Sequence, residues 1–348
     1  MNALTDKLTE WRDTIGDSLP EGNWAKRIAI AVGLYLLAMI ILGMYWSMAP
    51  ALFDVQDKAA QYAAEDDGTV VTGSVTTAAL MGVVETLLDK PGGYLRNDLV
   101  PPGAWLDNIP NWEYGVLVQV RDLARALREV HSRSQSQSTE DPDLAFAEPR
   151  FNFKADSWVL PSSESQYRDG LALTRGYFSR LSDRQARDAQ FYARADNLRY
   201  WLGTVNTRLG SLSQRLSASV GQRRINTDLA GDGSATQSTE TAPEVMVKTP
   251  WAKVDDVFYE SRGTAWALIH FLKAAEVDFA DVLRKKNAQV SLQQIVRELE
   301  RTQDVVWSPM IVNGTGFGIL ANHSLVMASY ISRANAAIID LRDLLSQG

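Results

Sequence analysis

The stretch that decides the fold is IAIAVGLYLLAMIILGMYWSM, residues 28–48, in which 21 consecutive residues carry no charge. As an α-helix rising about 1.5 Å per residue, it reaches about 30 Å, the thickness of the hydrocarbon core of a bilayer. Trp24, Tyr45 and Trp46 flank the run and suit the two membrane interfaces, where an amphipathic ring lies half in water. The sequence therefore predicts a transmembrane helix over residues 28–48.

Basic residues close to this run indicate how it is oriented. Arg12, Lys26 and Arg27 precede it, whereas Lys58 alone follows it closely. Lys and Arg favour the cytoplasmic side of a membrane. We therefore expect a protein of the bacterial inner membrane whose N-terminus is cytoplasmic and whose residues 49–348 lie in the periplasm.

A cleaved signal peptide is the alternative interpretation of the same run, since Ala49-Pro50-Ala51 has the small residues of a cleavage site. The uncharged run, however, exceeds the ~7–15 residues usual for the apolar part of a signal peptide, and the proline is badly placed for cleavage. We therefore expect the helix to be retained as an anchor in the lipid bilayer.

The composition narrows the classes of function. The chain of 348 residues contains no Cys, which excludes disulfides, thiolate nucleophiles and cysteine metal sites. The formal net charge is −7 and the sequence contains no basic cluster, so we expect no nucleic-acid partner. His131, His270 and His323 are the only histidines and lie far apart in the sequence, so no metal or other cofactor is predicted.

Residues 1–27 form a short cytoplasmic segment in this topology. Apolar residues at spacings of three and four predict an amphipathic helix near its start. These residues are Leu4, Leu8, Trp11, Ile15 and Leu19. Acidic residues occupy the opposite face, so the helix lacks the Lys-rich face of a binder of anionic lipid. We expect it to lie at the membrane interface, and contact with a cytoplasmic partner is the alternative. The segment is too short for an output domain, which excludes a sensor kinase or cyclase.

Helical periodicity recurs through residues 49–348 and no strand pattern competes with it, which predicts an all-α domain. The expected helices span residues 53–64, 76–88, 111–133, 164–220, 254–286, 291–302 and 322–345. A heptad seam in the longest helix requires a partner helix to cover it. The seam consists of Leu198, Leu202, Val205, Leu209, Leu212 and Leu216. Because Ser182-Asp183 could cap a new helix, the segment is either one rod or two helices. The prediction is an elongated bundle of long antiparallel helices.

Two segments lack this periodicity. Residues 134–163 contain a Ser/Gln repetition and three Pro, and are predicted to form a long surface loop. Residues 222–249 are rich in Gly, Ser, Thr, Asp and Glu and poor in large apolar residues, which predicts a disordered insertion. We expect both segments to be flexible loops.

Five tryptophans fall in predicted loops or at helix starts. They are Trp105, Trp112, Trp158, Trp251 and Trp307. Trp is a large apolar residue that often fixes a loop to the core, so we expect these rings to be buried. Exposed together, they would instead offer stacking platforms for a glycan.

One face of the predicted 254–286 helix carries aromatic and cationic side chains. They are Tyr259, Arg262, Trp266, His270 and Lys273, at spacings that place them in one row. Such a row suits an anionic ligand, a sugar or a partner, through charge-assisted hydrogen bonds and stacking. The alternative is that the face packs on another helix. We take Tyr259, Arg262, Trp266 and His270 as the candidate binding residues.

Glu260-Ser261 in the same helix is similar to the Glu-Ser pair of periplasmic lytic transglycosylases, which are all-helical enzymes that cleave peptidoglycan. The resemblance implies that Glu260 acts as the acid that protonates a glycosidic oxygen. The Gly-Leu-Met-Gln run of that family is absent. Glu260 is the catalytic candidate, and a solvated or ion-paired side chain is the alternative.

The stretch DDVFYESRGTAWAL, residues 255–268, resembles the signature region of an uncharacterised proteobacterial inner-membrane family, domain of unknown function 2333. The resemblance extends over most of the chain, from the apolar run to the last helix. It implies one N-terminal membrane anchor and a location in the cell envelope. It implies no activity and no catalytic residue.

Three functions are consistent with the sequence. The favoured one is a non-enzymatic periplasmic scaffold or adaptor whose helix faces bind other envelope proteins or further copies of the chain. A peptidoglycan-acting lytic enzyme or glycan binder centred on Glu260 is the first alternative. A helical bundle that binds a small ligand or lipid is the second. An enzyme is the less expected class.

Overall fold

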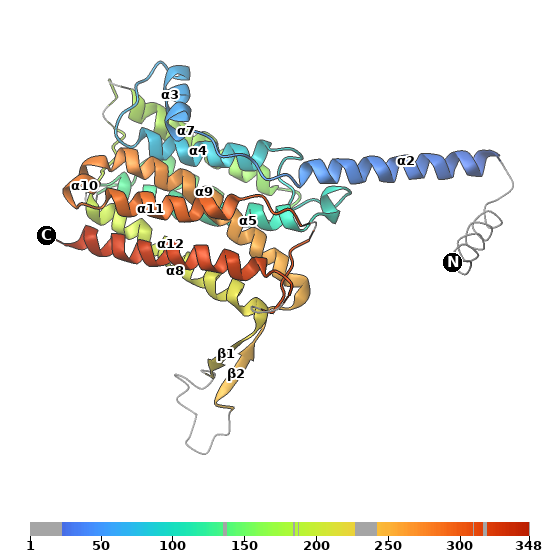
Figure 1. The fold of residues 1–348 in the computed structure, drawn as a ribbon. Helices are drawn as coiled ribbons and strands as arrows, with labels where there is room; N and C mark the ends of the chain where they lie inside the picture. Colours follow the sequence, from blue (N-terminus) through green and yellow to red (C-terminus); the bar gives the residue numbers. More distant parts are fainter. Residues whose placement is uncertain are drawn as a thin grey trace, which may run out of the picture.

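The computed structural model describes residues 23–134, 138–183, 185–186, 188–226, 242–308, 310–315 and 319–347. The amphipathic helix expected near the start of the chain lies outside these residues. Within them the protein is all-α, apart from one small β-hairpin, and consists of a helical bundle from which one long helix projects (Figure 1). The predicted fold class is confirmed.

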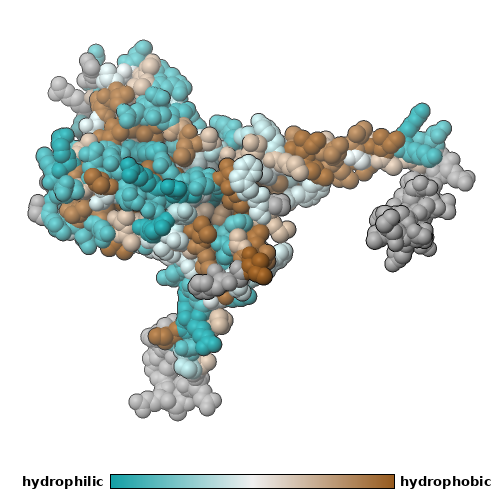
Figure 2. Space-filling model, viewed as in Figure 1, coloured by the Kyte–Doolittle hydropathy of each residue, from teal (hydrophilic) through white to brown (hydrophobic). Residues whose placement is uncertain are grey.

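The projecting helix, α2 (Asn23–Trp46), contains most of the uncharged run. Among the described residues it is the one helix that is long and apolar enough to cross a membrane. Figure 2 shows a continuous apolar surface along it, with hydrophilic residues at the end far from the bundle. Its large apolar side chains are exposed along its length, so α2 could cross a membrane.

The helices α5 (Asn108–Ala126) and α9 (Val254–Asp278) cross at the centre of the bundle. Each has a glycine at the crossing. A Cβ atom on Gly115 would lie 2.1 Å from the carbonyl oxygen of Glu260, and one on Gly263 would lie 2.0 Å from the carbonyl oxygen of Trp112. Backbone therefore packs on backbone, and no larger residue fits at either glycine.

Shorter helices surround this pair on one side. α4 (Ser74–Asp89) packs against α9 and also contacts α3 (Val55–Glu65) and α7 (Ser163–Ser182). α6 (Pro142–Phe151) lies against α7 and α5. Short 3-10 or π turns, η1 (Gly103–Trp105) and η2 (Leu127–His131), flank α5.

On the other side, α8 (Ala195–Ser217) packs along α12 (His323–Ser346), which also contacts α11 (Gln289–Glu300). The two long helices are antiparallel, because Gly203 faces Arg342 whereas Ser213 bonds to Ser332. The turns η3 (Ala218–Val220), η4 (Trp251–Lys253) and η5 (Arg301–Gln303) and the short α10 (Ala280–Lys285) complete this layer.

The heptad seam lies on α8, and all six of its residues are buried. The helix that covers the seam is α12 of the same chain. Of the two alternatives for residues 164–220, two helices is correct, because α7 ends at Ser182 and α8 begins at Ala195. The seam therefore stabilises the bundle itself.

Both predicted loops contain regular structure. Residues 142–151, in the middle of the first, form α6, whose first turn is capped by the Asp141 carboxylate. Gln222–Ile225 (β1) and Glu244–Val247 (β2), near the two ends of the second, pair as an antiparallel hairpin that projects from the bundle (Figure 1). The central part of that segment, residues 227–241, lies outside the described residues. The predictions of an uninterrupted loop and of no strand are wrong here.

The predicted 254–286 helix is also interrupted. It ends as α9 at Asp278, and α10 starts at Ala280. The residue between them, Phe279, is buried, and its ring lies edge-on against those of His131 and Phe191. The break turns this aromatic ring into the core.

A buried ion pair fixes the loop that follows α4. The fully buried carboxylate of Glu113 accepts hydrogen bonds from Lys90 Nζ and from the backbone N–H groups of Leu95 and Arg96, the last two at 2.9 and 2.8 Å. Buried charges are stable only when paired and hydrogen-bonded in this way. The loop so fixed carries Gly92, which packs on the indole of Trp46 at the end of α2.

Candidate functional site

Two of the four predicted binding residues are buried against the segment that joins α2 to α3. Trp266 Nε1 donates to the carbonyl of Pro50 at 3.0 Å, and the N–H of Phe53 donates to His270 Nε2 at 3.1 Å. His270 Nδ1 therefore carries the proton and donates to the carbonyl of Trp266 at 2.8 Å. Burial lowers the pKa of His270 to about 4, so the ring is neutral at pH 7. Both side chains hold the linker of α2.

The other two, Tyr259 and Arg262, lie half-buried on a different part of the α9 surface. The guanidinium of Arg262 donates to the backbone carbonyls of Gln303 and Asp304 at 2.7 and 2.9 Å. Burial lowers the pKa of Arg262. The structure thus separates the predicted row into a pair that binds the linker and an arginine that shapes a pocket.

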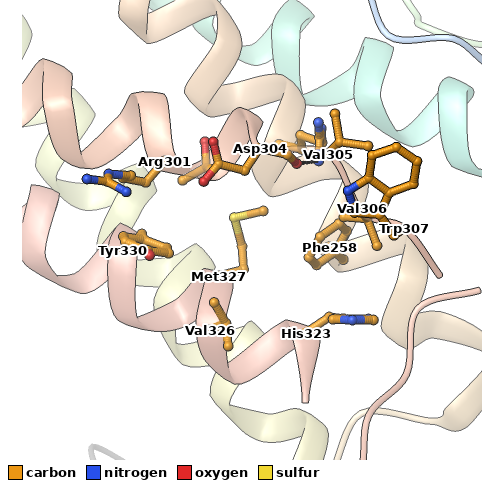
Figure 3. A pocket seen from close by; sticks show the side chains of 12 residues that line it. Phe258, Arg301, Asp304, Val305, Val306, Trp307, His323, Val326, Met327 and Tyr330 are labelled. Carbon is orange, nitrogen blue, oxygen red and sulfur yellow. Dashed lines mark hydrogen bonds between the residues drawn. The ribbon is translucent and has the colours of Figure 1, made fainter. Parts of the chain in front are cut away.

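This pocket, of about 240 Å³, lies between α9, α12 and the segment that follows η5 (Figure 3). Its apolar walls are formed by Phe258, Val305, Val306, Val326 and Met327. Its polar lining comes from Arg262, Arg301, Thr302, Asp304, His323 and Tyr330. The indole of Trp307 stands at one side and is 93% exposed. We call this site the Trp307 pocket.

Hydrogen bonds fix the start of α12 beneath the pocket. Asn322 caps the helix, because its side chain accepts the N–H of Leu325 at 2.9 Å. His323 Nδ1 accepts the N–H of Val312 at 2.9 Å, and the N–H of His323 donates to the carbonyl of Val312 at the same distance. The chain after the pocket is thereby held on the helix that forms its floor. Of the two residues that could cap this helix from the sequence, Asn322 and Ser324, the structure has Asn322.

A groove of about 460 Å³ adjoins the Trp307 pocket and shares Arg301 and Tyr330 with it. Arg297, Arg301 and Arg333 line it, and we call them the arginine strip. Arg333 pairs with Glu298 at 2.9 Å, whereas Arg297 and Arg301 form no ion pair with the residues that the structure describes. In a chain of net charge −7, this is a local positive surface that sequence analysis missed.

Glu260 lies on the side of α9 that faces α8. Its two carboxylate oxygens accept hydrogen bonds from Arg215 Nη1 and Nη2 at 2.7 and 2.5 Å. A general acid needs one oxygen free to hold and deliver a proton, and here the guanidinium occupies both. Among the residues that line the adjoining hollow, Glu260 is the only carboxylate, so the second acid of a glycosidase is not placed there.

Most of the residues that line that hollow, of about 350 Å³, are polar. Its lining includes Tyr114, Gln119, Thr207, Arg208, Ser211 and Thr264. The side chain of Gln119 is buried, and neither its amide nitrogen nor its amide oxygen has a hydrogen-bond partner among the described residues. An unpartnered buried amide requires a polar group, such as water or a ligand hydroxyl, to complete its bonding.

The expected burial of the five loop tryptophans is correct only for Trp112. Trp105, Trp158, Trp251 and Trp307 are each more than half exposed. Sequence alone does not distinguish the two situations, because a tryptophan in a loop or at a helix start can be buried or exposed. The exposed rings are the strongest indication of binding surfaces in the described part of the chain.

Comparison with known proteins identifies the family of this chain. The family model described as "Uncharacterized protein conserved in bacteria (DUF2333)" matches residues 19–348. No curated protein and no solved structure matches the chain. The matched range includes α2, the Trp307 pocket and the arginine strip.

Proposed function

This chain belongs to the family of uncharacterised proteins conserved in bacteria (DUF2333), and we propose that it is a non-enzymatic adaptor of the inner membrane that binds another envelope protein. In this proposal α2 spans the bilayer, and residues 49–348 lie in the periplasm. The length and apolar surface of α2 support the span. Lys26 and Arg27 at its start support a cytoplasmic N-terminus.

The observation that carries the proposal is the exposure of Trp307 beside a preformed apolar pocket. An indole in water is unfavourable unless a partner covers it, and Trp residues next to desolvated pockets dominate the energy of many protein interfaces. The pocket is the size of a side chain or two, and its walls suit an aliphatic or aromatic anchor of a partner.

The arginine strip indicates the chemistry of the partner around the side chain that enters the pocket. Arg301 links the strip to the pocket and has no acidic partner among the described residues. Guanidinium groups form short, directional hydrogen bonds with carboxylates and steer acidic surfaces into register. The partner segment is therefore acidic and carries an apolar side chain that enters the pocket.

A photocrosslinking amino acid in living cells tests this proposal on the full chain. Placed at Trp307, it should crosslink to a defined envelope protein, whereas Trp251, 86% exposed but outside the pocket, is the matched control position. The crosslink should be lost in Arg301→Glu and retained in Arg199→Glu, a charge reversal on the exposed surface of α8.

The outcomes separate the alternatives. A crosslink that survives Arg301→Glu contradicts the acidic partner, and one that forms equally at both tryptophan positions contradicts a defined pocket site. Crosslinks exclusively between two copies of the chain replace the adaptor with a self-association role.

Glycan binding in the hollow beside Glu260 is a second candidate function. The observation in its favour is the buried amide of Gln119, which has no partner among the described residues and which sugar hydroxyls could satisfy. We expect calorimetry with soluble muropeptides to show binding that is lost in Gln119→Leu. We expect no lysis of murein in zymograms by wild type or Glu260→Gln. Lysis by the wild type alone would overturn the adaptor proposal in favour of an enzyme.

A further inference from the structure

Two loops beside the end of α2 expose large apolar side chains. The first, residues 97–106, precedes α5, and the second, residues 157–161, precedes α7. The side chains more than half exposed are Leu99, Val100, Trp105, Trp158, Val159 and Leu160, the last at 92%. The exposed residues within these two ranges are uncharged, and exposed Asp107 and Asp156 lie directly after the first range and before the second. We call them the juxtamembrane loops.

Buried polar contacts join the two loops into one surface. The amide of Asn97 donates to the carbonyl of Ser157 and to a carboxylate oxygen of Glu164, both at 2.8 Å. The hydroxyl of Tyr94 donates to the carbonyl of Ala155 at 2.8 Å. Since Asn97 and Tyr94 are buried, these bonds hold the loops in fixed positions and leave the apolar side chains outside.

The first loop packs directly on α2. A Cβ atom on Gly43 would lie 3.6 Å from Leu106 and 3.7 Å from Pro102. Gly43 precedes Trp46, the last residue of α2, by three positions, or about 4.5 Å along the helix axis. Figure 1 shows the chain before α5 running beside the bundle end of α2. This loop therefore lies at the depth of the last turn of the apolar helix.

We propose that the juxtamembrane loops insert their apolar side chains into the lipid bilayer at the interface where α2 emerges. The inference rests on the proposed span of α2, and it adds a second, peripheral contact with lipid. Trp residues next to aliphatic residues are the composition of interfacial membrane anchors, where the ring lies between headgroups and acyl chains. Continuity with α2 identifies lipid, and not a protein groove, as the occupant.

This contact holds the bundle against the membrane surface. A single helix with a flexible linker would let the domain swing, whereas α2 is here fixed at Trp46 and Gly43 and the loops rest on the same leaflet. The start of α12, which lines the Trp307 pocket, lies at the end of the bundle from which α2 projects (Figure 1), so the pocket then has a defined height above the membrane.

The absence of Cys allows a direct test with single, fluorescently labelled cysteines in the full chain. Val100→Cys and Leu160→Cys report on the loops, and Leu36→Cys in the middle of α2 reports on the span. Val290→Cys, 76% exposed at the start of α11 and at the far end of the bundle, is the matched control. Each variant is labelled with an environment-sensitive dye and reconstituted in vesicles of phosphatidylethanolamine and phosphatidylglycerol.

We expect the labels at 36, 100 and 160 to emit at shorter wavelength and to be quenched by spin-labelled lipids, and the label at 290 to show neither effect. Quenching at 36 without quenching at 100 and 160 overturns the loop inference and leaves the span intact. No quenching at 36 overturns the span and with it the inference. Equal quenching at 290 shows non-specific adsorption and also overturns it. Circular dichroism confirms that each labelled variant is folded.

Discussion

The juxtamembrane loops and the Trp307 pocket are two apolar surfaces that differ in their neighbours. The chain before α5 and the start of α12, which carry them, both lie toward the end of the bundle from which α2 projects (Figure 1). The first loop packs on α2, a hydrogen bond joins the second loop to it, and the exposed residues within both ranges are uncharged. The pocket is concave and adjoins the arginine strip. Exposed tryptophan is common to both, so exposure alone does not identify the occupant. The charge beside each surface and the helix nearest to it identify the occupant.

The largest expected effect is a loss of stability on the side of the juxtamembrane loops, where Glu113 fixes the loop that follows α4. In Glu113→Ala, Lys90 remains buried without its counter-ion and two backbone N–H groups lose their acceptor. Removing one partner of a buried ion pair costs about 3–5 kcal/mol, so the free energy of unfolding should fall by that amount in urea denaturation followed by circular dichroism. The double variant Lys90→Met with Glu113→Leu should lose less, because no charge is left unpaired. Equal losses in both variants would contradict this account.

Acidic pH should also lower the stability of the protein, through His270, which binds the linker of α2. Burial lowers the pKa of His270 to about 4 in the folded protein, below the ~6.5 of the unfolded chain. Its contribution to stability is therefore fully present above pH 6.5 and is lost as the pH falls towards 4, by up to about 3 kcal/mol at ~1.4 kcal/mol per pKa unit.

The comparison with His270→Gln isolates this effect. The glutamine amide oxygen can still accept the N–H of Phe53 but does not titrate in this range. The difference in unfolding free energy between wild type and variant, measured by denaturation from pH 7 to pH 4, should shrink or change sign with falling pH. A constant difference would show that His270 does not sense pH. His131, whose pKa burial lowers to about 3, is present in both proteins and cancels.

On the pocket side, Trp307→Ala should weaken binding of the crosslinked partner by about 2 kcal/mol, or roughly 30-fold, as expected for a tryptophan at the centre of an interface. Trp251→Ala should leave the affinity unchanged. Surface plasmon resonance with the reconstituted full chain measures both. A loss of the same size in the control would place the interface elsewhere.

The smallest expected effect is the quenching by lipid of a label at the Trp307 pocket, compared with a label on the juxtamembrane loops. A dye on Trp307→Cys should show little quenching by spin-labelled lipid in vesicles without a partner, in contrast to the label on Val100→Cys. Quenching as strong as at Val100 would join the two surfaces into one lipid-facing end and contradict the partner site.

Most of the fold could be predicted from local periodicity in the sequence. The extent of α4, the seam of α8 and the cap of α12 at Asn322 follow from residues within a few positions of one another, and so could be predicted. α6 was missed because loop-like composition around it obscured a standard start, Asp141 with Pro142 in the first turn. The hairpin was missed because its strands have four residues each and are mostly exposed.

The candidate site was predictable only in part. The spacing of Arg262 and Trp266 correctly places both on α9, but the packing of residues 50–53 on Trp266 and of Gln303 on Arg262 is a long-range contact with no local signal. The arginine strip likewise joins α11 with α12. Sequence indicated which side chains could bind, and tertiary packing decided which of them reach solvent.

The glycine crossing of α5 and α9 fixes the spacing between two parts of the molecule. Gly263 is next to Arg262, which shapes the pocket, and three residues from Trp266, which holds the linker of α2. One turn of one helix therefore sets both positions, and backbone contact leaves that turn almost no freedom to rotate. α9 therefore keeps a constant spacing between the linker of α2 and the Trp307 pocket.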